Sequence, residues 1–464
     1  MNILALSTHV EAMGILKLLF YYIIVCTDIQ QGLGEQGWFW HVTDFHYDFT
    51  YKDRQLSCRG KNLTDPGIYG DYWCDSPWSL INSSVYAMAM FRPDVDFIIW
   101  TGDTVLHGKD EDLSITINSD ILKNLTDLLK TAFPQKTVFS AYGNHDYWPT
   151  DQFPDGNNEL YNRTLVEWGS WINNTNQEIN FLKGGYYTLL LEAAPKIRMM
   201  SLNTNLYYTS NKQTSNQTDP AGQFQWMESV LNNSRKLQEK VIVIAHIPPG
   251  VHTPDFVVWM YDQFNTRLNN IFQKYSDVIV AMHFGHDHAD GFKVYLNNSG
   301  DPVIPVFIAP SVTPWRYKPE HNPAIRLVSY DRQTGQHLDI EQYYLDLPEA
   351  NAKQTATWKL EYKATQNYGV KDLSPLSLLA LMNKMKDYGS NEFQNYFKWT
   401  TVNASTTEIC NTDCHLSIIC GFSNFDKTSY NYCKSKTASG STSRKRDILI
   451  PLVISVIVFQ RLFI

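Results

Sequence analysis

The segment FIIWTGD at residues 97–103 shows the pattern that decides the fold: a short apolar run ends abruptly in polar residues. The same pattern occurs in WFWHVTDFH at residues 38–46 and in TVFSAYGNHD at residues 137–146. Two further runs, at residues 241–245 and 278–282, end in histidines. Runs of about five β-branched or aromatic residues are typical of buried strands. We therefore predict a buried strand at each run, followed by polar side chains.

Helical stretches at residues 79–90 and 113–131 lie between some of these strands. Alternation of strands and helices predicts an α/β sheet. Ligands of open α/β sheets gather at the carboxyl ends of the strands. All of the polar clusters lie at such ends, so we expect them to form one site.

The character of the chain changes after about residue 345. Residues 350–430 are mostly polar with a helical patch at 373–386. We predict a catalytic domain at residues 35–345 and a small helical C-terminal subdomain, stapled by disulfides, at residues 346–436.

Composition narrows the possible functions. The chain has 464 residues, of which 43% are hydrophobic, and a net charge of -8. That is enough for a large core in a few domains. Because there is no basic excess, we expect no nucleic acid polymer as a partner.

The N-terminus has the features of a secretory signal, which we place in residues 1–34. Lys17 supplies a positive charge, and the apolar run at residues 18–26 is shorter than the ~20 residues of a bilayer span. Met13 is an alternative start, and the cleavage site within residues 26–34 stays open. We predict an extracellular protein, either secreted or at the cell surface.

The C-terminal residues 437–464 have the pattern of a GPI-attachment signal. Small residues at 438–443 are followed by a basic stretch at 444–446 and an apolar tail at 448–464. A retained membrane span would place the basic stretch on the outer side, against the positive-inside tendency. We expect a lipid anchor as the only membrane attachment, with a span or non-use of the signal as alternatives.

Cysteines and glycosylation sequons fit export. Removal of the signal leaves an even number of cysteines, which indicates disulfides. Proximity suggests Cys58–Cys74, Cys410–Cys414 and Cys420–Cys433, although other pairings stay open, and we rank a metal site at CNTDCH below this interpretation. N-glycosylation sequons occur at Asn62, Asn82, Asn124, Asn162, Asn173, Asn216, Asn232, Asn297 and Asn403.

The polar clusters contain the donors that a pair of metal ions needs. They read D-x-H, G-D, G-N-H-D, H and G-H-x-H in chain order. Imidazole and carboxylate suit zinc, iron and manganese, and Asn supplies a carbonyl oxygen. Any one cluster alone would be incidental, but the ordered set is not. The candidate ligands are Asp44, His46, Asp103, Asn144, His246, His286 and His288.

This order resembles the calcineurin-like metallophosphoesterases over about residues 38–344. The resemblance implies a four-layer α/β/β/α sandwich and two zinc ions. One ion would take Asp44, His46 and His288, the other would take Asn144, His246 and His286, and Asp103 would bridge them.

Further motifs resemble the acid sphingomyelinase-like phosphodiesterases of the 3a or 3b kind. They are DYWCDSP at residues 71–77, HIPPG at 246–250, NPAIR at 322–326, NTNLYY at 203–208 and VTPW at 312–315. The first strand follows the signal directly, so no saposin domain fits before it. Two positions depart from related patterns: Asp287 replaces the usual Thr or His between the paired histidines, and purple acid phosphatases would have a metal-binding Tyr where Leu106 stands.

We therefore expect a phosphodiesterase that uses a water activated by two zinc ions, with nucleotide or phosphocholine-type substrates. His145 is the candidate general acid because it is not needed as a ligand, and His107 is a second candidate. Asp146 is expected to orient His145. The alternatives are a surface binding protein with weak catalysis and a phosphomonoesterase. We expect a monomer.

Overall fold

The computed structural model describes residues 35–446 apart from 60–62, 65, 315–319 and 405–408. The predicted signal at residues 1–34, the apolar tail of the predicted GPI signal and the sequon at Asn62 lie outside the described residues.

Two six-stranded sheets form the centre of the protein. The first has the order Trp358–Lys363 (β14), His337–Leu345 (β13), Ala324–Asp331 (β12), Gln36–Val42 (β1), Phe97–Trp100 (β2) and Thr137–Ser140 (β3). The second has the order Gly291–Leu296 (β10), Pro302–Ile308 (β11), Ile279–Phe284 (β9), Lys240–Ile244 (β6), Ile197–Ser201 (β5) and Tyr187–Leu190 (β4).

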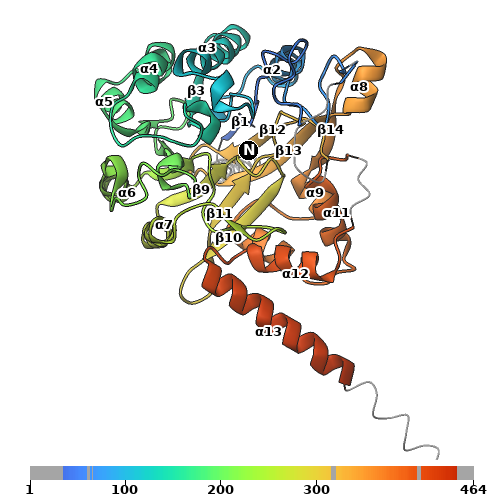
Figure 1. Ribbon diagram of the computed structural model, residues 1–464. Coiled ribbons are helices and arrows are strands. Elements are labelled where there is room, and N and C mark those ends of the chain that lie inside the picture. Colours follow the sequence, from blue (N-terminus) through green and yellow to red (C-terminus); the bar gives the residue numbers. More distant parts are fainter. Residues whose placement is uncertain (1–34, 60–62, 65, 315–319, 405–408, 447–464) are drawn as a thin grey trace, which may run out of the picture.

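Helices cover the outer faces of the sheets, which gives the predicted four-layer arrangement (Figure 1). Helices α2 (Trp78–Phe91) and α4 (Glu159–Ile172) contact the first sheet through β12 and β3, and helices α6 (Gln223–Leu237) and α10 (Pro375–Met385) contact the second through β6 and β11. The helices are Trp78–Phe91 (α2), Ile115–Ala132 (α3), Glu159–Ile172 (α4), Thr175–Gly184 (α5), Gln223–Leu237 (α6), Asp262–Lys274 (α7), Leu347–Lys353 (α8), Ala364–Tyr368 (α9), Pro375–Met385 (α10), Asn391–Trp399 (α11), Thr412–Gly421 (α12) and Lys427–Arg446 (α13).

The predicted strands are β1, β2, β3, β6 and β9, with ends shifted by at most two residues, and the predicted helices are α2, α3 and α10. The C-terminal region differs from the expectation. It is mainly helical, but β14 pairs with β13 and extends the first sheet beyond residue 345. The polar stretch before residue 446 is the end of α13, which projects from the body (Figure 1).

Three histidines fill the space between the two sheets. His41 of β1, His283 of β9 and His337 of β13 are at most 1% exposed. The Nδ1 atoms of His41 and His283 are 3.3 Å apart, and the Nε2 atoms of His283 and His337 are 2.7 Å apart. His337 Nδ1 lies 3.0 Å from the carbonyl oxygen of Gly335. Each of these contacts needs one N–H donor and one acceptor. A neutral imidazole ring has one of each, so the three histidines can form all of these hydrogen bonds without carrying a charge.

Acidification is expected to destabilise the protein through this row. Burial lowers the pKa of His337 to about 4 and the pKa of His41 and His283 well below the usual value of 6.5. A lowered folded-state pKa stabilises the fold above about pH 6.5, and this stability is lost as the pH falls from there toward about 4. Denaturant unfolding at a fixed metal-ion concentration measures the effect. His337→Phe should weaken the pH dependence between 7 and 5, and an unchanged slope would contradict the assignment.

Candidate dinuclear metal site

The polar clusters meet where the two sheets adjoin. The loops after β1 and β2 are joined by hydrogen bonds from Asp44 N to Gly102 O at 2.9 Å and from His46 N to Asp103 O at 3.1 Å. The loop after β9 reaches the loop after β6 through Gly285 N and His246 O at 3.0 Å. The sequence places these loops together because β1, β2 and β3 are parallel, as are β6 and β9.

The backbone is unusual at most of the candidate ligands. L-residues rarely adopt a positive φ, which costs free energy and concentrates at functional sites. The candidate ligands with a φ between 42° and 69° are Asp44, His46, Asp103, His286 and His288.

Two glycines allow the loops to approach this closely. A Cβ at Gly143 would lie 2.0 Å from Asp103 Oδ1, and a Cβ at Gly285 would lie 2.1 Å from Thr43 Oγ1. Both contacts are impossible for any other residue, which explains the glycine of G-N-H-D and of G-H-x-H.

One group of donors consists of Asp44, His46 and His288. His288 Nε2 lies 3.2 Å from Asp44 Oδ1 and 3.2 Å from His46 Nε2. A second group consists of Asn144, His246 and His286. Asn144 Oδ1 lies 3.1 Å from His246 Nε2 and 2.9 Å from His286 Nδ1.

Asp103 lies between the two groups. Its Oδ2 atom is 3.4 Å from His46 Nε2 and 3.1 Å from His246 Nε2. One carboxylate oxygen therefore faces both groups, as a bridging ligand must.

The arrangement fits cations. His46 Nδ1 lies 2.7 Å from Val105 O, and His246 Nδ1 lies 2.7 Å from Thr101 O, so each Nδ1 carries a proton and donates it. In the neutral rings, both Nε2 lone pairs then point at other acceptors. Asp44 Oδ1 is also buried without a hydrogen-bond partner. Converging acceptors of this kind are stable around a positive charge.

The pKa values of two candidate ligands also indicate that the site favours positive charge. Burial alone would lower the pKa of His46, but the Asp103 and Asp44 carboxylates raise it to about 9. Asp103 and Asp44 likewise raise the pKa of His246 to about 9 against the effect of burial. The carboxylates thus attract positive charge to both halves of the site.

His145 and His107 lie beside the first group of donors. The His145 ring is 4.4 Å from that of His107 and 5.2 Å from that of His46. His145 Nδ1 is buried without a hydrogen-bond partner. The His107 ring stacks on His46 at 4.0 Å. The side chains of His107, His46 and His288 also lie close enough together to hold a metal ion.

Asp146 does not orient the His145 side chain as expected. Its carboxylate instead accepts hydrogen bonds from the backbone of Asp103, Thr104 and Gly143. It therefore joins the loops after β2 and β3. Asp151, which the sequence did not single out, accepts a hydrogen bond from Asn144 Nδ2 at 2.8 Å and turns the amide oxygen toward the histidines.

Asp75 is another residue that the sequence did not single out, although it lies within the DYWCDSP motif. Its carboxylate oxygens are both 3.0 Å from His107 Nδ1, and Oδ2 also accepts the His107 backbone N–H at 2.7 Å. Asp75 is fully buried. It therefore fixes the orientation of the His107 ring.

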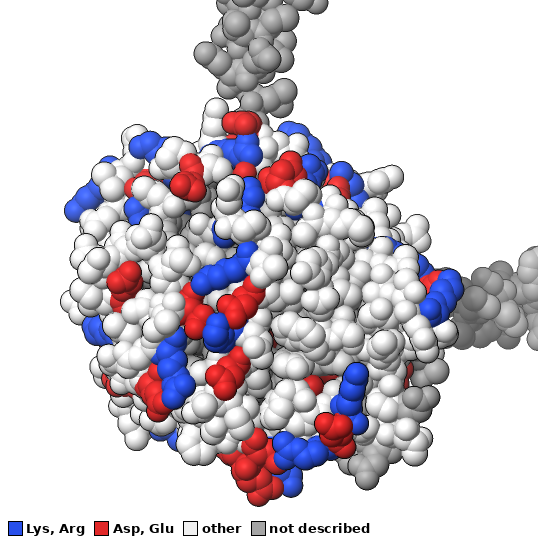
Figure 2. All heavy atoms as spheres, turned by 90° about the horizontal axis from the view of Figure 1, so that it is seen from above, with Lys and Arg blue, Asp and Glu red and all other residues white. Residues whose placement is uncertain are grey.

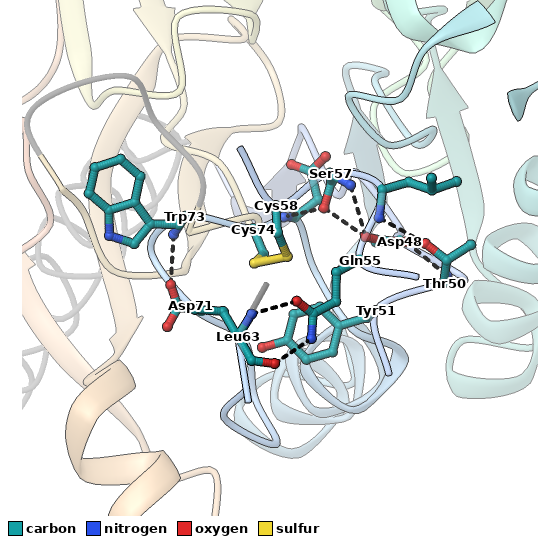
Figure 3. The surroundings of a disulfide bond; sticks show 12 residues. Asp48, Thr50, Tyr51, Gln55, Ser57, Cys58, Leu63, Asp71, Trp73 and Cys74 are labelled. Carbon is teal, nitrogen blue, oxygen red and sulfur yellow. Dashed lines mark hydrogen bonds between the residues drawn. A yellow bond between two sulfur atoms is a disulfide. The ribbon is translucent and has the colours of Figure 1, made fainter. Parts of the chain in front are cut away.

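A disulfide supports Asp75. The disulfides among the described residues are Cys58–Cys74, Cys410–Cys414 and Cys420–Cys433, the pairs that proximity suggested. Asp75 follows Cys74, and its backbone N–H donates to Ser57 Oγ, which in turn donates to Asp48. Figure 3 shows Ser57 and Asp48 beside the first disulfide.

Asp75→Asn is expected to lower kcat roughly tenfold, within the range typical of a residue that orients a functional histidine. KM and the bound metal content should change little. Steady-state kinetics and metal analysis test this, with the exposed Asp53→Asn as control. Loss of zinc from Asp75→Asn would instead mean that His107 is a metal ligand.

Comparison with known proteins decides the family. A family model described as calcineurin-like phosphoesterase matches residues 37–290, more than half of the chain. This chain belongs to that family. A second model, described as the acid sphingomyelin phosphodiesterase C-terminal region, matches residues 301–439. The family membership confirms the fold class and the phosphoesterase chemistry expected from the strand-end motifs.

Relatives place the chain in the acid sphingomyelinase-like branch. Human cyclic GMP-AMP phosphodiesterase SMPDL3A is 41% identical over 408 residues, covering 86% of this chain and 90% of that protein. Human acid sphingomyelinase-like phosphodiesterase 3b is 38% identical, covering 88% and 92%. Sphingomyelinase phosphodiesterase C of Dictyostelium discoideum is 36% identical, covering 74% and 81%. The chain is a phosphodiesterase of the metallophosphoesterase family.

Proposed function

We propose that this chain hydrolyses phosphodiesters with two zinc ions, one held by Asp44, His46 and His288 and the other by Asn144, His246 and His286. The position of the Asp103 Oδ2 atom between His46 Nε2 and His246 Nε2 carries the proposal. Nitrogen-rich donor sets with carboxylate suit zinc better than magnesium or calcium.

Bound zinc would supply positive charge to the phosphate oxygens and activate a water molecule for attack at phosphorus. The residues of this chain do the remaining work. Asp103 keeps the two halves of the site together, while Asp151 and the carbonyl oxygens of Val105 and Thr101 hold the ligand side chains in orientation. His145 protonates the departing oxygen, and His107, held by Asp75, assists it.

The substrate is proposed to be a soluble nucleotide or a phosphocholine-type diester, in line with the names of the relatives. Lys and Arg are interspersed with Asp and Glu on the face in Figure 2. This face has no continuous basic stripe of the kind that binds the backbone of a nucleic acid polymer.

We further propose that the protein is exported, N-glycosylated and attached to the cell surface by a lipid anchor. We also propose that it is a monomer. Every sequon asparagine among the described residues is at least partly exposed, as attachment of a glycan requires. No helix in the described part is long and apolar enough to cross a membrane. Release from cells by phosphatidylinositol-specific phospholipase C would test the anchor, and the sedimentation of the purified protein would test the monomer.

Metal removal tests the function directly. Chelation should abolish hydrolysis of bis(4-nitrophenyl) phosphate, and zinc should restore it, with Mg²⁺ as the matched control that does not. Full turnover in a preparation free of transition metals would contradict the proposal, and restoration by manganese or iron alone would contradict the choice of zinc.

A further inference from the structure

The side chain of Asp287 contacts Trp259 and His252, although the residue lies between His286 and His288. Its Oδ1 atom accepts a hydrogen bond from Trp259 Nε1 at 2.8 Å, and its Oδ2 atom lies 3.0 Å from His252 Nδ1. The carboxylate is only 6% exposed. Among the described residues, the groups able to hold a metal ion do not include it. The reaction proposed above gives this buried carboxylate no role.

Trp259, the residue that Asp287 holds, lies against a candidate zinc ligand. Its ring centre is 4.5 Å from that of His286, and the two planes are at 84°. The ring of Tyr208 lies 5.4 Å from His286 at 82° and 6.2 Å from Trp259. Trp259 is half-buried, so part of a large aromatic ring is open to solvent beside the second group of donors.

The orientation of Trp259 is fixed from several directions. The backbone of Trp259 accepts a hydrogen bond from Thr209 N at 2.8 Å, and Met260 bridges to Tyr208. The indole N–H is held by Asp287, and the His252 ring lies 5.6 Å away. An aromatic surface that is fixed in advance loses little conformational entropy when a ligand binds it.

The hairpin before Trp259 is itself held by the C-terminal helices. It consists of Val251–His252 (β7) and Val257–Val258 (β8). Ser417 of α12 donates to Pro254 O at 2.8 Å, and Tyr430 of α13 packs on Phe256 at 5.0 Å. The Cys420–Cys433 disulfide links these two helices. The C-terminal helices therefore hold the hairpin that positions Trp259 beside the candidate metal site.

We propose that Asp287 is a positioning residue for Trp259, and that Trp259 is the surface on which a planar group of the substrate stacks beside the Asn144–His246–His286 half of the site. The proposal rests on the phosphodiesterase function and adds its selectivity. Both Asp287 oxygens are already engaged, so the carboxylate is not free to pair with a cationic head group. The Trp259 ring suits the planar base of a nucleotide diester, because aromatic faces stack on every nucleobase.

Matched substrates test the proposal. Thymidine 5′-(4-nitrophenyl phosphate), 4-nitrophenyl phosphorylcholine and methyl 4-nitrophenyl phosphate share a leaving group and differ in the retained group. Trp259→Leu and Asp287→Ala should raise KM for the thymidine diester roughly tenfold more than for the other two, because stacking on an aromatic ring is worth about that factor. Bound zinc should not change.

Conservative variants separate positioning from structure. Trp259→Phe keeps a ring, and Asp287→Asn keeps an acceptor for the indole N–H, so both should recover part of the selectivity. Trp226→Leu, which removes a half-buried tryptophan on α6 packed against Tyr186 at 4.5 Å, is the matched control and should leave the KM ratio unchanged.

Each outcome decides a different point. An equal rise in KM for all three diesters, or no rise, contradicts the stacking surface. A larger rise in KM for the phosphorylcholine ester means that the Trp259 ring binds a cationic group instead. Loss of zinc from Asp287→Ala contradicts a positioning role. If the zinc-loaded wild type hydrolyses none of the diesters, the proposed function is wrong. Calorimetry of thymidine 5′-monophosphate binding to the wild type and to Trp259→Leu then still tests whether Trp259 is a stacking surface.

Discussion

Asp103→Asn is expected to lower turnover by roughly a thousandfold and to lower bound zinc below two ions per chain. The amide keeps the size of the side chain and an acceptor for the His145 backbone N–H, which Asp103 Oδ1 now binds at 2.8 Å. It loses the negative charge that faces His46 and His246. Metal-ion catalysis contributes several kcal/mol of charge stabilisation, and each 1.36 kcal/mol corresponds to about a factor of ten.

Metal analysis and kinetics on one preparation test this expectation. Asp127→Asn, an exposed carboxylate on α3, is the control for loss of a charge. Circular dichroism should show the same fold for both variants, because the sheets and disulfides do not depend on Asp103. Full zinc content with normal turnover in Asp103→Asn would remove the bridging assignment.

His145→Ala is expected to slow hydrolysis by about 10²–10⁴-fold when the leaving group is an alkoxide, the usual contribution of a general acid. A nitrophenolate leaves without much help from a proton, so the loss should be much smaller. The ethyl and 4-nitrophenyl diesters of the same nucleoside 5′-phosphate provide the comparison. Bound zinc should stay near the wild-type value.

The structure sharpens the alternative for His145. The ring packs against His107 and His46, and the side-chain amide of Asn144 is held by Asp151 instead. If it merely supports the first group of donors, alanine would lower zinc content and slow both diesters equally. That result would rule out the general-acid role.

The strand-end pattern predicted which residues the structure brings together as the candidate site. Apolar runs that end in polar residues identified β1, β2, β3, β6 and β9, because buried parallel strands need continuous apolar sequence. The parallel arrangement then brings their carboxyl ends together. The candidate ligands could be found this way because each lies within four residues of the end of a strand.

Other features depend on contacts that no local pattern contains. Asp75 and Asp151 lie in loops and acquire their roles only from the position of His107 and Asn144 in space. The positive φ at Asp44 and His46 follows from loop packing, not from residue type. Strand β14 was missed because its alternating pattern is short and its partner β13 is needed to make it a strand.

Each sheet combines strands from before residue 290 with strands from beyond residue 300, and this limits how the protein can be truncated. Strand β1 pairs with β12 on one side, and β9 pairs with β11, so both strands depend on residues beyond 300. A chain cut after residue 290 would expose unpaired backbone edges on two strands from the middle of the protein. Such edges recruit other chains and favour inclusion bodies. Soluble expression of the candidate site therefore requires the sequence through at least β12.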